Sequence, residues 1–139
     1  MRPLIIGTGS IGQRHIQNLQ SPHAVSQFLL LRDRAREDDF SRSLEANVVG
    51  DMEAALSCAP DFAVIATPSA RHIDSLVPLI AAGIPVYIEK PVVTTRKHVT
   101  QLRSQLKSAQ YSAPNLVGCN LRFLSSLEIV PVMKTLNPD

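Results

Sequence analysis

Short runs of consecutive apolar residues recur along this chain, separated by longer segments of helical or polar character. The runs cover residues 4–6, 28–31, 47–49, 62–66, 86–88 and 116–119. Because they are continuously apolar rather than alternating, these strands are expected to be covered on both faces, as in a parallel sheet. Alternation of strands and helices with right-handed crossovers then predicts an α/β fold with a doubly wound parallel sheet in a single domain.

Helix signals fill the segments between the runs. Helices are expected over 11–19, 52–58 and 121–136. Two further helices are expected to begin after the capping residues Ser69 and Thr95. Asp51 is expected to cap the helix over 52–58. The polar stretch over 34–46 is only weakly helical.

Composition limits the function classes that need to be considered. A length of 139 residues allows one domain with a core, but not a cofactor domain together with a substrate domain. A net charge of +2 and an aromatic content of 4% argue against nucleic-acid binding. No apolar stretch approaches the roughly 18 residues of a membrane span. Cys58 and Cys119 lack metal-site spacing, so no metal is expected, and buried free thiols favour a cytoplasmic location.

The strongest motif is the glycine pattern GxGxxG, which runs from Gly7 to Gly12 between the first strand and the first helix. In that context it is the dinucleotide-binding fingerprint of a Rossmann fold, with strand order 3-2-1-4-5-6. Gly7 permits the tight turn, Gly9 lets the backbone approach a pyrophosphate, and Gly12 lets the helix pack closely. The alternative is a glycine-rich turn without a ligand.

An acidic residue follows the second strand. Asp33 lies about 20 residues after Gly12, where a carboxylate can accept hydrogen bonds from the ribose hydroxyls and repel a 2′-phosphate. This favours NAD, with NADP still possible, because Arg32 or Arg34 could stack on adenine or hold a 2′-phosphate if Asp33 turned away. A third interpretation is an exposed aspartate within a solvated charge run.

Residues at the ends of the later strands carry a resemblance to a known family. In open parallel sheets, ligands bind beyond the carboxyl ends of the strands. Glu89-Lys90-Pro91 follows the fifth strand, and the chain also contains the opening glycine motif with Arg14-His15, Ala66-Thr67-Pro68-Ser69 followed by His72, and the run from Gly118 to Phe123. In this order the motifs resemble the N-terminal NAD(P)-binding domain of the Gfo/Idh/MocA (glucose–fructose oxidoreductase/inositol dehydrogenase) family, over essentially the whole chain.

The resemblance implies roles for individual residues. Lys90 matches the catalytic lysine near the nicotinamide, where its ammonium would stabilise an alkoxide; the alternative is a solvated lysine. Asn120 and Arg122 would lie on the substrate side, and Arg122 could instead be a structural ion-pair partner. His72 would line the cofactor cleft or lie on a helix surface. The expected cofactor contacts are Gly7, Gly9, Ser10, Ile11, Gly12, Asp33, Arg34, Thr67, Pro68, His72, Glu89 and Lys90.

The resemblance also implies a domain organisation and an activity. Residues 1–120 would be the dinucleotide-binding domain, and 121–139 the helical start of a connection to a substrate domain that this chain lacks. The expected enzyme is an oxidoreductase that transfers a hydride between NAD(P) and a sugar, polyol or similar secondary alcohol. It would be a homo-oligomer at full length, whereas this chain would be inactive, and a monomer or weak dimer. The alternatives are a non-catalytic dinucleotide-binding module and a subunit of a split protein.

Overall fold

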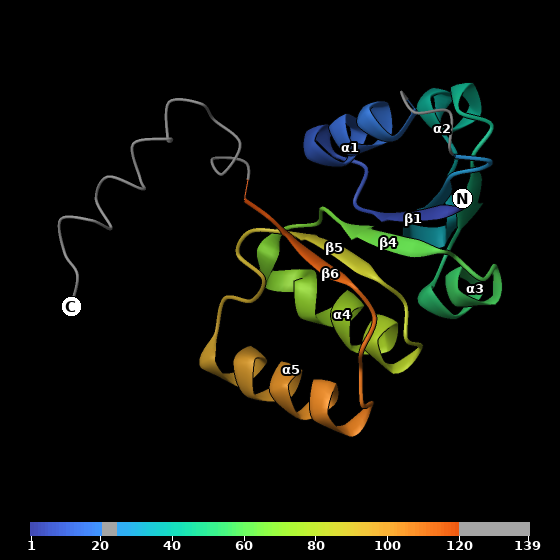
Figure 1. Ribbon diagram of the computed structural model, residues 1–139. Helices are drawn as coiled ribbons and strands as arrows, with labels where there is room; N and C mark the ends of the chain where they lie inside the picture. The colour runs from blue at the N-terminus through green and yellow to red at the C-terminus, as the bar shows by residue number, and fades with distance from the viewer. Residues whose placement is uncertain (21–24, 120–139) are drawn as a thin grey trace, which may run out of the picture.

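A six-stranded parallel sheet forms the centre of the molecule (Figure 1). The computed structural model describes residues 1–20 and 25–119. The strands are ordered β3-β2-β1-β4-β5-β6, and every neighbouring pair is parallel. Their bounds are Pro3–Ile6 (β1), Leu29–Leu31 (β2), Asn47–Val49 (β3), Phe62–Ile65 (β4), Val86–Glu89 (β5) and Asn115–Gly118 (β6). This confirms the predicted doubly wound fold and its strand order.

Helices cover both faces of this sheet. The α-helices are Ser10–Gln20 (α1), Asp39–Ser43 (α2), Met52–Ser57 (α3), His72–Ala81 (α4) and Arg96–Ser108 (α5), with 3₁₀ turns at Asp33–Ala35 (η1) and Ser69–Arg71 (η2). Successive side chains of a strand point to opposite faces. Leu4 and Ile6 of β1 therefore join the core under α3 and α4, whereas Ile5 joins the core under α1. Both faces of the central strand are buried, as its apolar run predicts.

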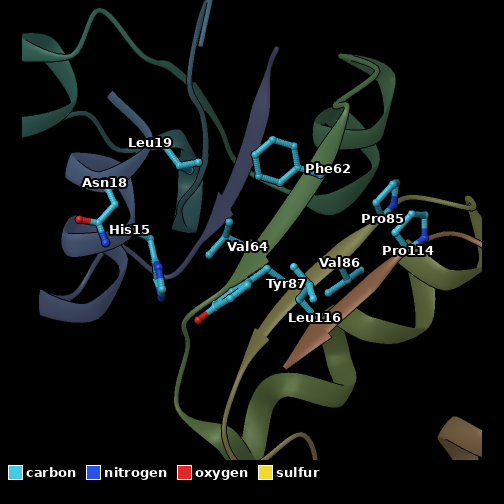
Figure 2. Close-up of a pocket in the computed structure, with 10 residues that line it drawn as sticks. All are labelled: His15, Asn18, Leu19, Phe62, Val64, Pro85, Val86, Tyr87, Pro114 and Leu116. Carbon is cyan, nitrogen blue, oxygen red and sulfur yellow. The ribbon is translucent and has the colours of Figure 1, made fainter. Parts of the chain in front are cut away.

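The sheet is less well covered at its β6 edge. Leu116 is 67% exposed and Val117 is 45% exposed, so the expectation that every strand is covered on both faces is wrong for β6 within the described residues. The reason is topological, because β6 is the edge strand and α1 reaches only as far as β4 and β5 on its face of the sheet. An apolar groove of about 370 Å³ lies beside α1 (Figure 2). It is lined by His15, Asn18, Leu19, Phe62, Val64, Pro85, Val86, Tyr87, Pro114 and Leu116.

The helix caps follow the sequence signals with one exception. The side chain of Asp51 accepts a hydrogen bond from the Ala54 amide at 2.8 Å, and that of Thr95 accepts one from the His98 amide at 3.1 Å. The expected cap at Ser69 is wrong, since α4 starts at His72 and has no side-chain cap. The amide of Arg71 bonds to the Pro68 carbonyl and closes the 3₁₀ turn η2 first, which displaces the start of the α-helix.

Several expectations concern membranes, metals or the end of the chain. Among the described residues, no helix is long and apolar enough to cross a membrane, and no group of three or more His, Cys, Asp or Glu side chains could hold a metal ion. Cys58 and Cys119 are free thiols. The helical stretch expected over 121–136, and with it Asn120 and Arg122, lies outside the described residues.

Candidate functional site

A cleft of about 610 Å³ opens at the carboxyl ends of the central strands. It brings together three regions that are far apart in the sequence, namely the glycine loop after β1, the acidic turn after β2 and the loop after β4. Gly7, Asp33 and Thr67 all line this strand-end cleft. Its remaining lining residues are Ile6, Thr8, Leu31, Arg32, Gly50, Asp51, Met52, Arg71, Asp74 and Ser75.

The glycine loop is shaped by two close contacts and one open space. Gly7 has φ +96°, and a Cβ there would lie 2.7 Å from the backbone of Ala66 and Thr67. A Cβ on Gly12 would overlap the Gly7 carbonyl oxygen. At Gly9 nothing lies within 4 Å of the Cβ position, so the protein itself does not require a glycine there. This open space just before α1, whose amides start at Ser10 and Ile11, fits a pyrophosphate that approaches the backbone.

Thr67 offers a second feature that fits a bound cofactor. Its hydroxyl oxygen is buried and has no hydrogen-bond partner among the described residues, although the residue lines the cleft. A buried polar group without a partner is costly. A ligand in the cleft would supply the missing hydrogen bond.

Replacing Thr67 with valine tests this interpretation. The variant removes a hydroxyl that makes no hydrogen bond to the described residues, so its free energy of unfolding should stay within about 0.5 kcal/mol of the wild type. NADH affinity should fall by about fivefold, the loss of about one hydrogen bond. Chemical unfolding and calorimetric titration measure the two quantities. A loss of stability without a loss of affinity would show that the hydroxyl serves the fold.

The acidic turn after β2 places both Arg32 and Asp33 at the cleft, with Arg32 held by a second carboxylate. Asp33 is exposed and begins η1. The guanidinium of Arg32 forms a 2.7 Å ion pair with Asp38, and its side chain is only 14% exposed. A smaller cavity of about 490 Å³ lies over this turn, lined by Thr8, Arg32, Asp33, Arg36 and Asp38. Because the charge of Arg32 is already compensated, Arg34 and Arg36 are the better candidates for holding a 2′-phosphate.

Asp38 organises this turn and has a perturbed titration. The backbone amide of Ser41 and the guanidinium of Arg32 hold the pKa of Asp38 at about 2, below its usual 3.8. A depressed carboxyl pKa contributes stability that is fully present above pH 3.8 and is lost as the pH falls toward 2. We therefore expect Asp38→Asn to be less stable than the wild type at neutral pH, with the difference shrinking between about pH 4 and pH 2. Urea unfolding over this range measures it, and a pH-independent difference would contradict the prediction.

Lys90 directly follows β5, and His72 is the first residue of α4, which comes after the loop that follows β4. Lys90 is exposed directly after the strand. His72, in contrast, is 1% exposed, so the alternative of a helix-surface histidine is wrong. Its Nδ1 lies 2.9 Å from the Pro91 carbonyl oxygen and its Nε2 lies 2.9 Å from the Thr67 carbonyl oxygen. His72 therefore connects the loop that carries Lys90 to the loop that lines the cleft.

The Glu89 carboxylate faces α1. Its Oε1 lies 2.7 Å from Nε2 of His15, whose ring packs edge-on against Tyr87 with centroids 4.9 Å apart. A Cβ on Gly118 would lie 2.7 Å from the Tyr87 hydroxyl, so any larger residue at that position of β6 would require the Tyr87 side chain to shift. Figure 2 shows His15 and Tyr87 at the same end of the apolar groove, with Pro85 and Pro114 at the other.

His15 belongs to the opening motif, and the sequence predicts no separate role for it. A signal for one was present, because Gly12, His15, Ile16 and Leu19 have the i, i+3, i+4, i+7 spacing of one helix face. That face of α1 packs on the sheet. A histidine on it requires a polar partner in the sheet below, and the structure provides Glu89.

Comparisons with known proteins indicate which family the chain belongs to. The chain is 36% identical over 98 residues to inositol 2-dehydrogenase of Acidiphilium cryptum, a match that covers 66% of the chain and 29% of that relative. The chain thus spans under a third of the length of this relative.

Solved structures share the fold. The WlbA dehydrogenase of Bordetella pertussis, in complex with NADH and UDP-GlcNAcA, superimposes with a TM-score of 0.80 at 19% identity, over 96% of this chain and 42% of that one. GenD2 from gentamicin A biosynthesis, in complex with NAD, superimposes with a TM-score of 0.68 at 27% identity, over 84% of this chain and 34% of that one. The family described as "Oxidoreductase family, NAD-binding Rossmann fold" matches residues 1–113. The chain therefore belongs to the Gfo/Idh/MocA oxidoreductase family, and residues 1–113 match its NAD-binding Rossmann fold.

Proposed function

We propose that the strand-end cleft binds NAD with its pyrophosphate over Gly9 and its adenosine ribose against Asp33. The observation that carries this proposal is the glycine loop, where Gly7 and Gly12 form a turn that admits no side chain and Gly9 faces open space. Ser10 and Ile11 offer their amides at the start of α1. Thr67 lines the cleft, and we propose that Thr67 and the neighbouring Pro68 would border the nicotinamide.

The reaction that fits these residues is hydride transfer between the nicotinamide and a secondary alcohol. A nicotinamide held in the strand-end cleft would supply the hydride chemistry. The exposed Lys90 ammonium donates a hydrogen bond to the reacting oxygen and stabilises negative charge on it. Glu89 supports this function indirectly, since its bond to His15 fixes the end of β5 against the helix that begins at the phosphate loop.

A sugar or polyol is the proposed substrate class. The relative from Acidiphilium cryptum is an inositol 2-dehydrogenase, and the WlbA structure contains a nucleotide sugar. We propose that residues 1–120 form the cofactor domain, that Asn120 and Arg122 approach the substrate, and that 121–139 lead to the part of the protein that completes the substrate site. A homo-oligomeric full-length enzyme and a cytoplasmic location, in keeping with the two free thiols, belong to the same proposal.

Calorimetric titration of the 139-residue chain with NADH and with NADPH tests the cofactor assignment. We expect NADH to bind about tenfold more tightly than NADPH, because the Asp33 carboxylate repels a 2′-phosphate. The variant Asp33→Ser should narrow this difference. The matched control is Asp39→Ser, which removes a fully exposed carboxylate on α2 that pairs with Arg42. If NADPH binds more tightly, recognition of the ribose end of the cofactor is assigned to Arg34 and Arg36. If the chain binds neither NADH nor NADPH, the proposal is contradicted.

A further inference from the structure

We propose that Arg71 is a further cofactor ligand, whose guanidinium pairs with the pyrophosphate of a dinucleotide bound in the strand-end cleft. This inference rests on the proposed function, since it requires a dinucleotide in that cleft. Arg71 is the last residue of the 3₁₀ turn η2 and directly precedes α4, on the segment that follows β4. Its side chain lines the strand-end cleft, although the glycine motif and the acidic turn assign it no role.

Arg71 and Asp33 belong to opposite walls of the cleft. The strand that leads into the glycine loop, β1, pairs with β2 on one side and with β4 on the other. Asp33 follows β2, and Arg71 follows β4. The segment after β4 comes close to the loop, because a Cβ on Gly7 would lie 2.7 Å from the Thr67 amide nitrogen. With the ribose against Asp33 and the pyrophosphate over Gly9, Arg71 is therefore the cation on the far side of the phosphates.

The charges around the cleft show why a cation is needed on that side. Among the described residues that line it, the acidic side chains are Asp33, Asp51 and Asp74, and the basic ones are Arg32 and Arg71. Arg32 is already compensated by its 2.7 Å ion pair with a carboxylate of the turn after β2. A pyrophosphate brings further negative charge into this acidic lining, and a nearby cation offsets the repulsion. Arg71 is the lining cation that can do so.

The contact that Arg71 makes is one that a ligand can replace. Its Nε lies 3.9 Å from a carboxylate oxygen of Asp74, and the two side chains are 74% and 65% exposed. An exposed ion pair of this length contributes little to stability. The backbone is fixed, in contrast, because the Arg71 amide donates a hydrogen bond to the Pro68 carbonyl at 2.9 Å. The side chain can therefore turn from Asp74 to the phosphates, to which a guanidinium can donate two parallel hydrogen bonds.

Calorimetric titration of Arg71→Gln with NADH and with ADP-ribose tests this contact. ADP-ribose keeps the adenosine and the pyrophosphate but lacks the nicotinamide, so both ligands should lose affinity equally, by about tenfold at low ionic strength. The loss should fall below about threefold near about 1 M ionic strength, where the screening length is only about 3 Å. Arg71→Lys keeps the charge without the planar fork, and its affinity should lie between those of the wild type and Arg71→Gln.

The matched control is Arg103→Gln, which removes an exposed arginine from α5 and should bind both ligands as the wild type does. Urea unfolding of Arg71→Gln should have the wild-type midpoint, and a lower midpoint would assign the side chain to the fold instead. Wild-type affinity in Arg71→Gln, a loss that salt does not weaken, or equal losses in the lysine and glutamine variants would overturn the pairing with pyrophosphate and leave the proposed function standing. If the wild-type chain binds neither NADH nor ADP-ribose, the proposed function fails, and this inference fails with it.

Discussion

Replacing Gly12 with alanine is expected to lower the free energy of unfolding by about 3 kcal/mol or more and to abolish dinucleotide binding. The added Cβ would overlap the Gly7 carbonyl oxygen and approach its carbon to 2.9 Å. Both contacts are with backbone, so no side-chain rotation can relieve them. Either α1 moves away from the sheet or the turn opens, and each change removes the amides from the position of the pyrophosphate.

Gly9→Ala is the matched control for this substitution. It adds the same methyl group three residues earlier in the same motif, at a position where no atom of the described residues lies within 4 Å. Its free energy of unfolding should stay within about 0.5 kcal/mol of the wild type, whereas NADH should bind at least about tenfold more weakly because the methyl group occupies the space of the pyrophosphate. Urea unfolding and calorimetric titration separate the two effects. Wild-type NADH affinity in Gly9→Ala would contradict the placement of the pyrophosphate.

Replacing Lys90 with alanine is expected to lower kcat of the active protein by about 10²- to 10³-fold, the effect of removing one donor to a developing oxyanion. NADH affinity should change little, because Lys90 is proposed to act on the reacting oxygen rather than to hold the cofactor. Steady-state kinetics with a polyol substrate, combined with NADH titration of the same variant, measure the two effects.

The control for Lys90 is Lys97→Ala, which removes the same charge from an exposed position on α5. It should retain the wild-type rate. A Lys90→Ala variant that also retained the wild-type rate would remove Lys90 from the chemistry and would favour a dinucleotide-binding module without catalysis. Equal losses of kcat and of NADH affinity would instead indicate that the loop had moved.

The fold was predictable because its main determinants are local. Continuous apolar runs indicate strands that are buried on both faces, and the structure confirms this for β1, where Leu4 and Ile5 are fully buried on opposite faces. The glycine motif between a strand and a helix then indicates the Rossmann arrangement. Asp51 and Thr95 cap the helices that they were predicted to cap, since a capping residue acts on an amide only three positions further along the chain.

Features that depend on distant contacts were not predictable in the same way. The bond between His15 and Glu89 joins residues 74 positions apart, and nothing near either residue in the sequence identifies the other. The sequence alone allows a surface position for His72. In the structure its ring contacts the carbonyl of Pro91, a residue 19 positions away. The exposure of Leu116 follows from the position of β6 at the edge of the sheet rather than from its apolar sequence.

The central position of β1 also affects how the protein is made. Among these strands, β1 is the first to be synthesised, yet it pairs with β2 through Leu4 and Leu29 and with β4 through Leu4 and Ala63. Ribosomes add about 5–20 residues per second, so roughly 3–12 seconds separate the synthesis of β1 from that of its second neighbour. During this interval β1, whose four residues are all buried in the finished sheet, has an unpaired edge, which makes the nascent chain a target for chaperones that recognise short extended apolar segments.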